Sequence, residues 1–492
     1  MYKETLNKDL TKLAAVEHAT QSLGREFSRI GWALLFLAIT SNVAMIATVG
    51  MDHQMFIVAA GVIGGYMALN IGANDVANNV GPAVGSRALS MTGALVIAAV
   101  FESMGAIVAG GDVVKTISKG IVDPHQIGDP DVFIWAMMSA LLAAALWVNL
   151  ATWLSAPVST THAVVGGVMG AGIAAAGFGV VDWPVMGAIA ASWVISPLLG
   201  GVIAALFLAF IKFNIIYRAD KIAGAKRWVP VLVALMAGVF SAYLMMKGLK
   251  KVWRPGPEMI VAAGFGVYLV TYLIVRPLIH RKAAGMENRN KSVRTLFTLP
   301  LICAAALLSF AHGANDVANA VGPLAAVVDT AATGGAHGKV GIPSWVLFVG
   351  AAGITMGLLL FGPKLIRTVG AEITKMNPMR AYCVALAAAI TVIIASALGL
   401  PVSSTHIAVG AVFGVGFFRE WFTGRNTHIT RGRESGEDTP APQARENAER
   451  SRRRKLVRRQ HFTTIVAAWI VTVPCAALMG GGLFLAIAWA FD

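Results

Sequence analysis

Charge is scarce in this chain of 492 residues. Only 13% of the residues are Asp, Glu, Lys or Arg, about half the share that a soluble globular protein carries. Hydrophobic residues make up 57% of the chain, and the mean hydropathy is +0.69. Such a composition excludes an ordinary soluble protein and indicates a helical membrane protein.

Cysteine is also rare, with three residues in the whole chain. Cys303, Cys383 and Cys475 lie within or beside apolar runs, without paired spacing or histidine neighbours at metal-ligand spacing. We therefore interpret them as small packing residues and expect neither a disulfide framework nor a thiolate metal site. A cleavable signal peptide is not expected either, because about thirty residues of mixed charge precede the first apolar run.

Long apolar runs are abundant by contrast. We identify thirteen, each suited to cross the membrane or to form part of a re-entrant hairpin. They span residues 31–50, 55–74, 89–110, 131–153, 157–178, 184–211, 228–246, 258–275, 295–314, 343–362, 381–399, 401–418 and 463–490. The sequence therefore predicts an all-α polytopic membrane protein with about 12–13 transmembrane or re-entrant helices.

The basic residues give these helices an orientation. All 40 Lys and Arg residues fall between the apolar runs, and 33 of them lie on one side if the N-terminus is cytosolic. Because positive loops stay in the cytosol, we expect a cytosolic N-terminus and a location in the plasma (cell inner) membrane. The net charge of +15 is then an orientation signal, and the expected surroundings are a lipid bilayer with no nucleic-acid partner.

Two sequence motifs occur twice. Residues 72–82 read GANDVANNVGP and residues 313–323 read GANDVANAVGP, which are identical at ten of eleven positions. Residues 156–172 (APVSTTHAVVGGVMGAG) correspond in the same way to residues 400–416 (LPVSSTHIAVGAVFGVG). The repeated order of motifs and apolar runs indicates an internal duplication, which is typical of secondary transporters.

The duplication divides the chain into predicted units. They are a cytosolic N-terminal segment (1–30), an extra transmembrane helix (31–50), a first transport repeat (55–211), a linker with two transmembrane helices (212–294) and a second transport repeat (295–490). Seven crossings separate the starts of the repeats, and an odd number inverts the second one. A basic, polar stretch (419–461) interrupts the second repeat and is predicted to be a disordered cytosolic loop.

Three of the 25 acidic residues lie well inside apolar runs or at their broken ends, namely Asp75, Glu102 and Asp316, and the others lie in loops, tails or at helix ends. We expect no basic residue inside the membrane to pair with them, so they must be protonated, hydrogen-bonded or neutralised by a bound cation. Asp75 and Asp316 occupy equivalent places in the two copies of the first motif. This duplication favours a functional role over a purely structural one.

The surroundings of these two aspartates suit a hard cation. Four asparagines offer amide oxygens: Asn74, Asn78, Asn315 and Asn319. We expect the glycines and prolines of the motif to break the helix and free backbone carbonyls. Oxygen ligands without thiolates, and with no clear set of imidazoles, favour Na⁺ or H⁺ over a transition metal. We therefore predict Na⁺ at Asp75 and Asp316.

The second motif suits an anion. Pro157 and Pro401 are expected to begin a helix, because proline fits the first helical turn. Hydroxyl side chains follow beside free N–H groups at the positive end of the helix dipole: Ser159, Thr160, Thr161, Ser403, Ser404 and Thr405. Two such helix starts facing each other would make a neutral cage for a tetrahedral oxyanion, although Ser and Thr also cap helices in many proteins.

These doubled motifs resemble those of the inorganic phosphate transporter (PiT) family, and the match covers nearly all the apolar runs. The resemblance implies that Asn74, Asp75, Asn315 and Asp316 share a phosphate and cation site with the six hydroxyl residues. It implies symport of phosphate with Na⁺ or H⁺, no resident cofactor, and homodimers as a plausible assembly. Glu102 also resembles a family glutamate that is important for transport.

The leading hypothesis is thus a symporter that imports inorganic phosphate with a cation, with Na⁺ favoured over H⁺. A sulfate permease of the same architecture is the alternative, since sulfate is also tetrahedral. A membrane phosphatase is disfavoured, because the hydroxyl runs are followed by histidines with no acid alongside to orient them, and no enzyme is expected. A phosphate sensor that does not transport is a third hypothesis.

Overall fold

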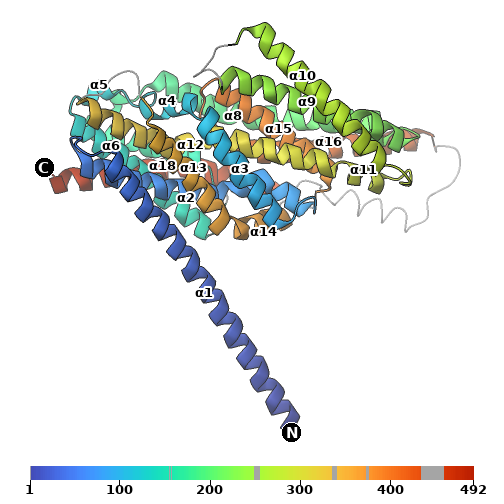
Figure 1. Ribbon diagram of the computed structural model, residues 1–492, viewed down its shortest axis with the longest axis horizontal. Coiled ribbons are helices and arrows are strands. Elements are labelled where there is room, and N and C mark those ends of the chain that lie inside the picture. The colour runs from blue at the N-terminus through green and yellow to red at the C-terminus, as the bar shows by residue number, and fades with distance from the viewer. Residues whose placement is uncertain are drawn as a thin grey trace.

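The computed structural model describes residues 2–154, 156, 158–248, 255–334, 341–372, 376–433 and 459–491. These residues are almost entirely helical (Figure 1). The long helices are α1 (Tyr2–Ala47), α2 (Gln54–Gly85), α3 (Met91–Ala109), α6 (Pro130–Trp153), α7 (Thr160–Ala176), α8 (Trp183–Ile211), α9 (Lys221–Lys247), α10 (Pro257–Lys282), α12 (Thr298–Thr333), α13 (Ser344–Leu360), α15 (Pro378–Ala397), α16 (Ser404–Arg433) and α18 (Arg459–Phe491). The short helices are α4 (Gly111–Lys119), α5 (Pro124–Ile127), α11 (Asn290–Leu296) and α14 (Gly362–Glu372).

The predicted fold class is confirmed. Ten helices among the described residues are long and apolar enough to cross a membrane, and α7 and α13 are shorter apolar helices. The remaining predicted run, 401–418, lies largely in α16. The outer helix α10 turns large apolar side chains away from the protein, with Val261 69% and Phe265 64% exposed. Surfaces of this kind suit contact with lipid rather than with water.

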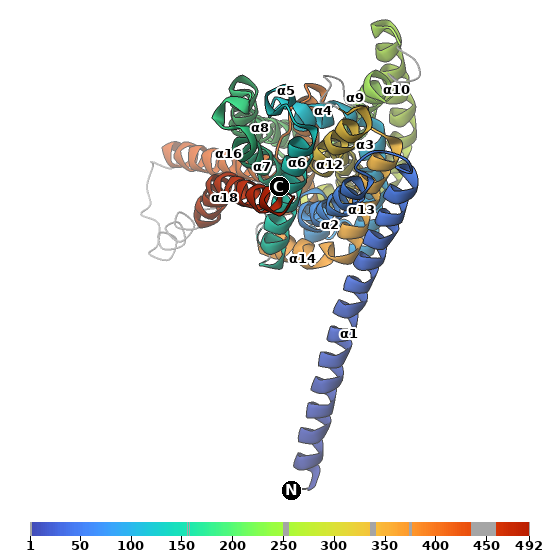
Figure 2. The same cartoon turned by 90° about the vertical axis from the view of Figure 1, so that its left-hand side faces the viewer.

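Two predicted boundaries change. Helix α1 begins at Tyr2, so most of the predicted N-terminal segment is helical and continuous with the first membrane helix. Its N-terminal part projects well beyond the bundle (Figures 1 and 2). Helix α16 continues to Arg433, which shortens the loop predicted over 419–461 from its start. Residues 434–458 of that loop lie outside the described residues.

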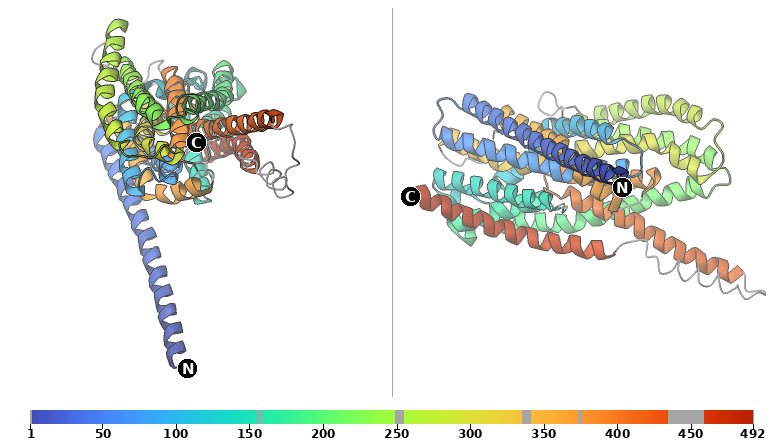
Figure 3. Two further views of the ribbon diagram at one scale, coloured as in Figure 1. Left: turned by 90° about the vertical axis from the view of Figure 1, so that its right-hand side faces the viewer. Right: turned by 90° about the horizontal axis from the view of Figure 1, so that it is seen from below.

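Helices from the two halves of the chain pack against one another. Helix α13 packs along α2, while α3, which holds the same place in the first half, packs along α12. In the same way α18 packs on α7, and α8 packs on α16. Figure 3 (right) shows long helices running roughly along the long axis of the bundle. Since α2 also contacts α12, the two GANDVAN helices lie together inside one bundle.

The GANDVAN helices are continuous, which corrects the predicted break. Both α2 and α12 run through their motifs, each with its proline inside the helix. A Cβ atom at Gly72 would overlap the carbonyl oxygen of Ile354 in α13, and one at Gly313 would overlap that of Glu102 in α3. The motif glycines therefore permit close helix packing, as small residues do in membrane proteins, rather than ending the helix.

Candidate functional site

The four polar motifs meet at one buried centre. Helices α2 and α12 supply Asp75 and Asp316, each with 1% of its surface exposed. The starts of α7 and α16 supply the hydroxyl residues, all of which are buried as well. With Glu102 from α3, the structure thus brings together all the sequence-predicted site residues, although they come from five helices far apart in the chain.

The hydroxyl motifs lie at helix starts, as predicted, but Pro401 lies upstream of the first helical turn. Helix α7 begins at Thr160 with Ser159 as its N-cap, whose side chain accepts a hydrogen bond of 3.1 Å from the His162 N–H. Ser403 accepts the equivalent bond from the His406 N–H at 3.3 Å. Pro401 precedes the helical residues because Ser403 caps the helix. Pro157 lies outside the described residues.

Each aspartate is bonded to a hydroxyl from its own half of the chain. Thr160 Oγ1 donates to Asp75 Oδ2 at 2.9 Å, and Ser404 Oγ donates to Asp316 Oδ2 at 2.9 Å. Thr405 adds a bond between the halves, donating to Asp75 Oδ1 at 3.2 Å. The carboxylates and the helix starts therefore form one connected network.

The first asparagine of each motif holds the segment that leads into the facing helix start. Asn74 Nδ2 donates to Thr152 Oγ1 at 3.0 Å, and Asn315 Nδ2 donates to Ser396 Oγ at 2.9 Å. The Asn315 Oδ1 oxygen accepts from the Val402 N–H at 3.3 Å, whereas the Asn74 Oδ1 oxygen has no hydrogen-bond partner. The Asn74 oxygen is therefore without a partner, while the Asn315 oxygen, which can accept two bonds, accepts one.

The second asparagine of each motif reaches across to the other half. Asn78 Nδ2 donates to Thr405 Oγ1 at 2.8 Å, and Asn319 Nδ2 donates to Thr161 Oγ1 at 3.1 Å. Thr161 Oγ1 in turn donates to the Val402 carbonyl at 3.0 Å. These bonds join the two helix starts across the two halves of the chain.

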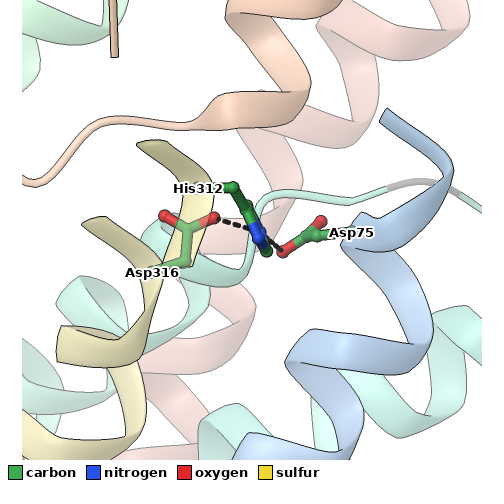
Figure 4. Close-up of side chains that lie close together, drawn as sticks. All are labelled: Asp75, His312 and Asp316. Atoms are coloured by element: carbon green, nitrogen blue, oxygen red, sulfur yellow. Dashed lines mark ion pairs between the residues drawn. The ribbon is translucent and has the colours of Figure 1, made fainter. Parts of the chain in front are cut away.

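His312 lies at the middle of the network, where sequence reasoning did not place it. Its Nε2 atom lies 2.8 Å from Asp316 Oδ2 and 3.7 Å from Asp75 Oδ2 (Figure 4). Its Nδ1 atom lies 3.4 Å from Glu102 Oε2. The expectation that no basic residue could pair with the three buried acids was therefore wrong. The signal was present in the sequence, since His312 precedes Asp316 by one helical turn.

Glu102 belongs to the same centre. It is fully buried on α3, and Asn79 Nδ2 donates to its Oε1 atom at 2.7 Å. The corresponding position to Asn79 in the second motif is Ala320, so this pair exists in the first half alone. The two halves therefore share one bond between an aspartate and a hydroxyl of the same half, and they differ in the Thr405–Asp75 bond and in their acids and bases.

The apolar helices and the buried polar centre define a multi-pass integral membrane protein with a polar site inside the bundle. Membrane transporters belong to this class of protein. The profile of the "Phosphate transporter family" matches residues 71–480. The chain belongs to the phosphate transporter family.

Relatives agree with this assignment over nearly the whole chain. A protein of Helicobacter pylori strain J99, named "putative phosphate permease", is 46% identical over 97% of this chain and 98% of its own length. A relative from Pyrococcus abyssi is 34% identical over 88% of this chain and 98% of its own length. A solved structure described as "The sodium-dependent phosphate transporter" matches with a TM-score of 0.78 at 34% identity, over 88% of this chain and 99% of that chain. The chain is thus related to transporters and not to enzymes.

Proposed function

We propose that this protein imports inorganic phosphate by symport with Na⁺. The observation that carries the proposal is the bond between each buried carboxylate and a hydroxyl at a helix start, Asp75 with Thr160 and Asp316 with Ser404. A cation at the carboxylate and an anion at the adjoining helix start would lie in direct contact. In buried surroundings of low dielectric, each would then strongly stabilise the other.

Electrostatics makes the coupling obligatory in this proposal. Moving an anion into a cell against a negative interior potential costs about 2.3 kcal/mol per charge per 100 mV. Cations bound at Asp75 and Asp316 offset that charge, and their gradient drives the transport. Without the cations, the two carboxylates repel the anion, which therefore cannot cross alone.

The unpaired oxygens favour Na⁺ over a proton. Asn74 Oδ1, Asp316 Oδ1 and Glu102 Oε2 are buried without a hydrogen-bond partner. A hard cation can gather several such oxygens, whereas a proton satisfies one of them. The matching solved structure is described as that of a sodium-dependent transporter, which supports the same choice.

The proposal divides the ligands between the two ions. Phosphate binds at the two helix starts, with the asparagines Asn74 and Asn315 beside it. Na⁺ binds at Asp75 and Asp316 with amide oxygens of the motif asparagines Asn74, Asn78, Asn315 and Asn319. Glu102 acts through His312 and Asn79 as a coupling residue. The N-terminus lies in the cytosol and the protein in the plasma membrane, as the distribution of basic residues predicts.

Uptake into proteoliposomes tests the proposal. Labelled phosphate should accumulate when an inward Na⁺ gradient is imposed and should not respond to a proton gradient alone. Unlabelled phosphate and arsenate should compete, and sulfate should not. Stronger inhibition by sulfate than by phosphate would identify the alternative, a sulfate permease. Equal uptake with and without the Na⁺ gradient would contradict Na⁺ coupling.

A matched pair of variants separates transport from sensing. Asp75→Asn removes a buried carboxylate of the centre, while Asp52→Asn changes an exposed aspartate just before α2. We expect the first variant to fold without transporting and the second to transport normally. Phosphate binding without uptake by the unmodified protein would instead indicate a sensor.

A further inference from the structure

Asp75, His312 and Asp316 could hold one metal ion. Each offers a ligand atom, and these atoms all lie within 4.8 Å of one another (Figure 4). No other group of His, Cys, Asp or Glu side chains in the described part of the chain is gathered so closely. All three residues are buried, so the cluster differs from the loose acidic groups that occur on protein surfaces.

The spacing of the ligand atoms suits a small divalent ion. Ligand atoms about 2.0–2.1 Å from a tetrahedral zinc ion lie about 3.3 Å from one another. The His312 Nε2 atom lies 2.8 Å from Asp316 Oδ2 and 3.7 Å from Asp75 Oδ2, on either side of that value. Each of these two distances thus differs from the tetrahedral value by about half an ångström, and all three ligand atoms lie within 4.8 Å of one another.

The imidazole is surrounded by the carboxylates of Asp75, Glu102 and Asp316. Its Nε2 atom lies 2.8 Å from Asp316 Oδ2, whereas the Asp316 Oδ1 oxygen has no hydrogen-bond partner. A buried carboxylate oxygen without a partner is costly unless a ligand satisfies it. A divalent cation bound at Nε2 would displace the proton that lies between the imidazole and the carboxylates, and the two aspartates would complete its ligand set.

The second nitrogen of His312 is supported as it is in metal sites. Histidine ligands usually donate their other N–H group to a carboxylate, which fixes the ring and strengthens the ligand. Here the His312 Nδ1 atom lies 3.4 Å from Glu102 Oε2, and Asn79 holds the other oxygen of that carboxylate at 2.7 Å. Asn79, Glu102 and His312 have no counterparts in the other half, where Ala320 and Ile71 stand at two of these positions.

We propose that Asp75, His312 and Asp316 bind a divalent transition-metal cation such as Zn²⁺, with Glu102 as a positioning residue, and that the bound metal stops transport. Imidazole nitrogen favours Zn²⁺ over Mg²⁺ and Ca²⁺, which prefer oxygen ligands alone. The metal would join α2 to α12 and exclude Na⁺ from the carboxylates. Only the inhibition, and not the binding, rests on the proposed function.

Thermal unfolding of the purified full-length protein in detergent, without Na⁺ or phosphate, tests the binding. Zn²⁺ should raise the unfolding temperature at concentrations at which Mg²⁺ has no effect, and His312→Gln should abolish the rise. His53→Gln is the matched control, because His53 lies 3.2 Å from Asp131 in a partly exposed histidine–carboxylate pair. A rise that persists in His312→Gln, or is equally large with Mg²⁺, would overturn the proposal.

A second variant keeps the test decisive if His312→Gln does not fold. Glu102→Gln removes the charge behind the imidazole while preserving shape and the contact with Asn79. It should weaken Zn²⁺ binding by about 10- to 100-fold. Unchanged Zn²⁺ affinity in Glu102→Gln would contradict the role assigned to Glu102 and to the Nδ1 contact.

Transport assays separate this inference from the proposed function. If Zn²⁺ stabilises the protein but phosphate uptake does not depend on Na⁺, the proposed coupling is contradicted and the metal site is supported. If uptake is coupled to Na⁺ but Zn²⁺ neither inhibits it nor raises the unfolding temperature, the metal site alone is contradicted. We expect Zn²⁺ to inhibit Na⁺-coupled uptake, and Na⁺ in excess to relieve the inhibition.

Discussion

The two halves of the buried centre share one bond between a hydroxyl and a carboxylate, and they differ in the acids and bases around it. Thr160 bonds to Asp75 as Ser404 bonds to Asp316, at the same distance of 2.9 Å. By contrast, only the first half has the Asn79–Glu102 pair, and only the second has the histidine that precedes its aspartate by one helical turn. The shared contacts are those a symmetric anion would need.

The difference teaches that the two aspartates are not interchangeable. Asp75 accepts hydrogen bonds from hydroxyls of both halves, whereas Asp316 accepts one from its own half and lies against His312. A duplicated chain begins with two equal cation sites and can make them unequal by a few substitutions. Here the inequality is concentrated at Asn79, Glu102 and His312.

The largest expected effect is the loss of either buried aspartate, because transport should require both halves. Asp75→Asn and Asp316→Asn should each reduce phosphate uptake to background, by about 100-fold or more, because each removes a buried charge with its cation partner. Uptake should be measured in proteoliposomes with equal amounts of folded protein. Activity above half in either variant would contradict a requirement for both halves.

Packing of the motif glycines should be equally strict in the two halves. Gly72→Ala and Gly313→Ala each place a methyl group against a backbone carbonyl of a neighbouring helix. Overpacking of this kind costs about 1–3 kcal/mol or more, so a marked fall in unfolding temperature and folded yield is expected. Gly266→Ala on α10, where a Cβ would meet nothing within 4 Å, is the matched control. Normal stability of both motif variants would show that the helices can separate freely.

Equivalent threonines should give unequal results. Thr161 donates to the Val402 carbonyl, while Thr405, its counterpart, donates to the Asp75 carboxylate. Thr161→Val and Thr405→Val should each raise the phosphate KM by about tenfold, the value of one lost hydrogen bond. Only Thr405→Val should also raise the Na⁺ concentration that gives half-maximal uptake. Identical Na⁺ dependence in the two variants would remove the distinction between the halves.

The smallest effect should be the same in both halves. Ser159→Ala and Ser403→Ala each remove an N-cap bond at a buried helix start. Loss of such a cap costs about 1 kcal/mol, so the two variants should lower the unfolding temperature by similar, small amounts. A large loss in one variant alone would show that its helix start has a further structural role.

The sequence predicts the apolar helices and the meeting of the doubled motifs, because both follow from local hydrophobicity and from the repeat. The sequence does not show whether a motif glycine ends its helix or allows a second helix to pack closely. Whether Gly72 ends a helix or admits a neighbour depends on α13, a helix that lies far away in the chain. Only the folded arrangement decides between these two roles.

His312 was missed for a different reason. A neutral histidine in an apolar run is ordinary packing in most proteins, and the search for basic partners counted Lys and Arg. The contacts to Asp75 and Glu102 come from α2 and α3, so they cannot be read from the order of residues in α12. The one local signal was the spacing from Asp316.

The most direct test of the account is the binding of labelled Na⁺ and labelled phosphate to purified Asp316→Asn and Thr161→Val. Thr161 contacts neither aspartate in the described hydrogen-bond network, so its variant separates the two ligands. The account predicts that Thr161→Val keeps Na⁺ binding and loses phosphate affinity, while Asp316→Asn loses Na⁺ binding even without phosphate. Normal Na⁺ binding by Asp316→Asn, or loss of Na⁺ binding in Thr161→Val, would contradict the assignment of cations to the carboxylates and phosphate to the helix starts.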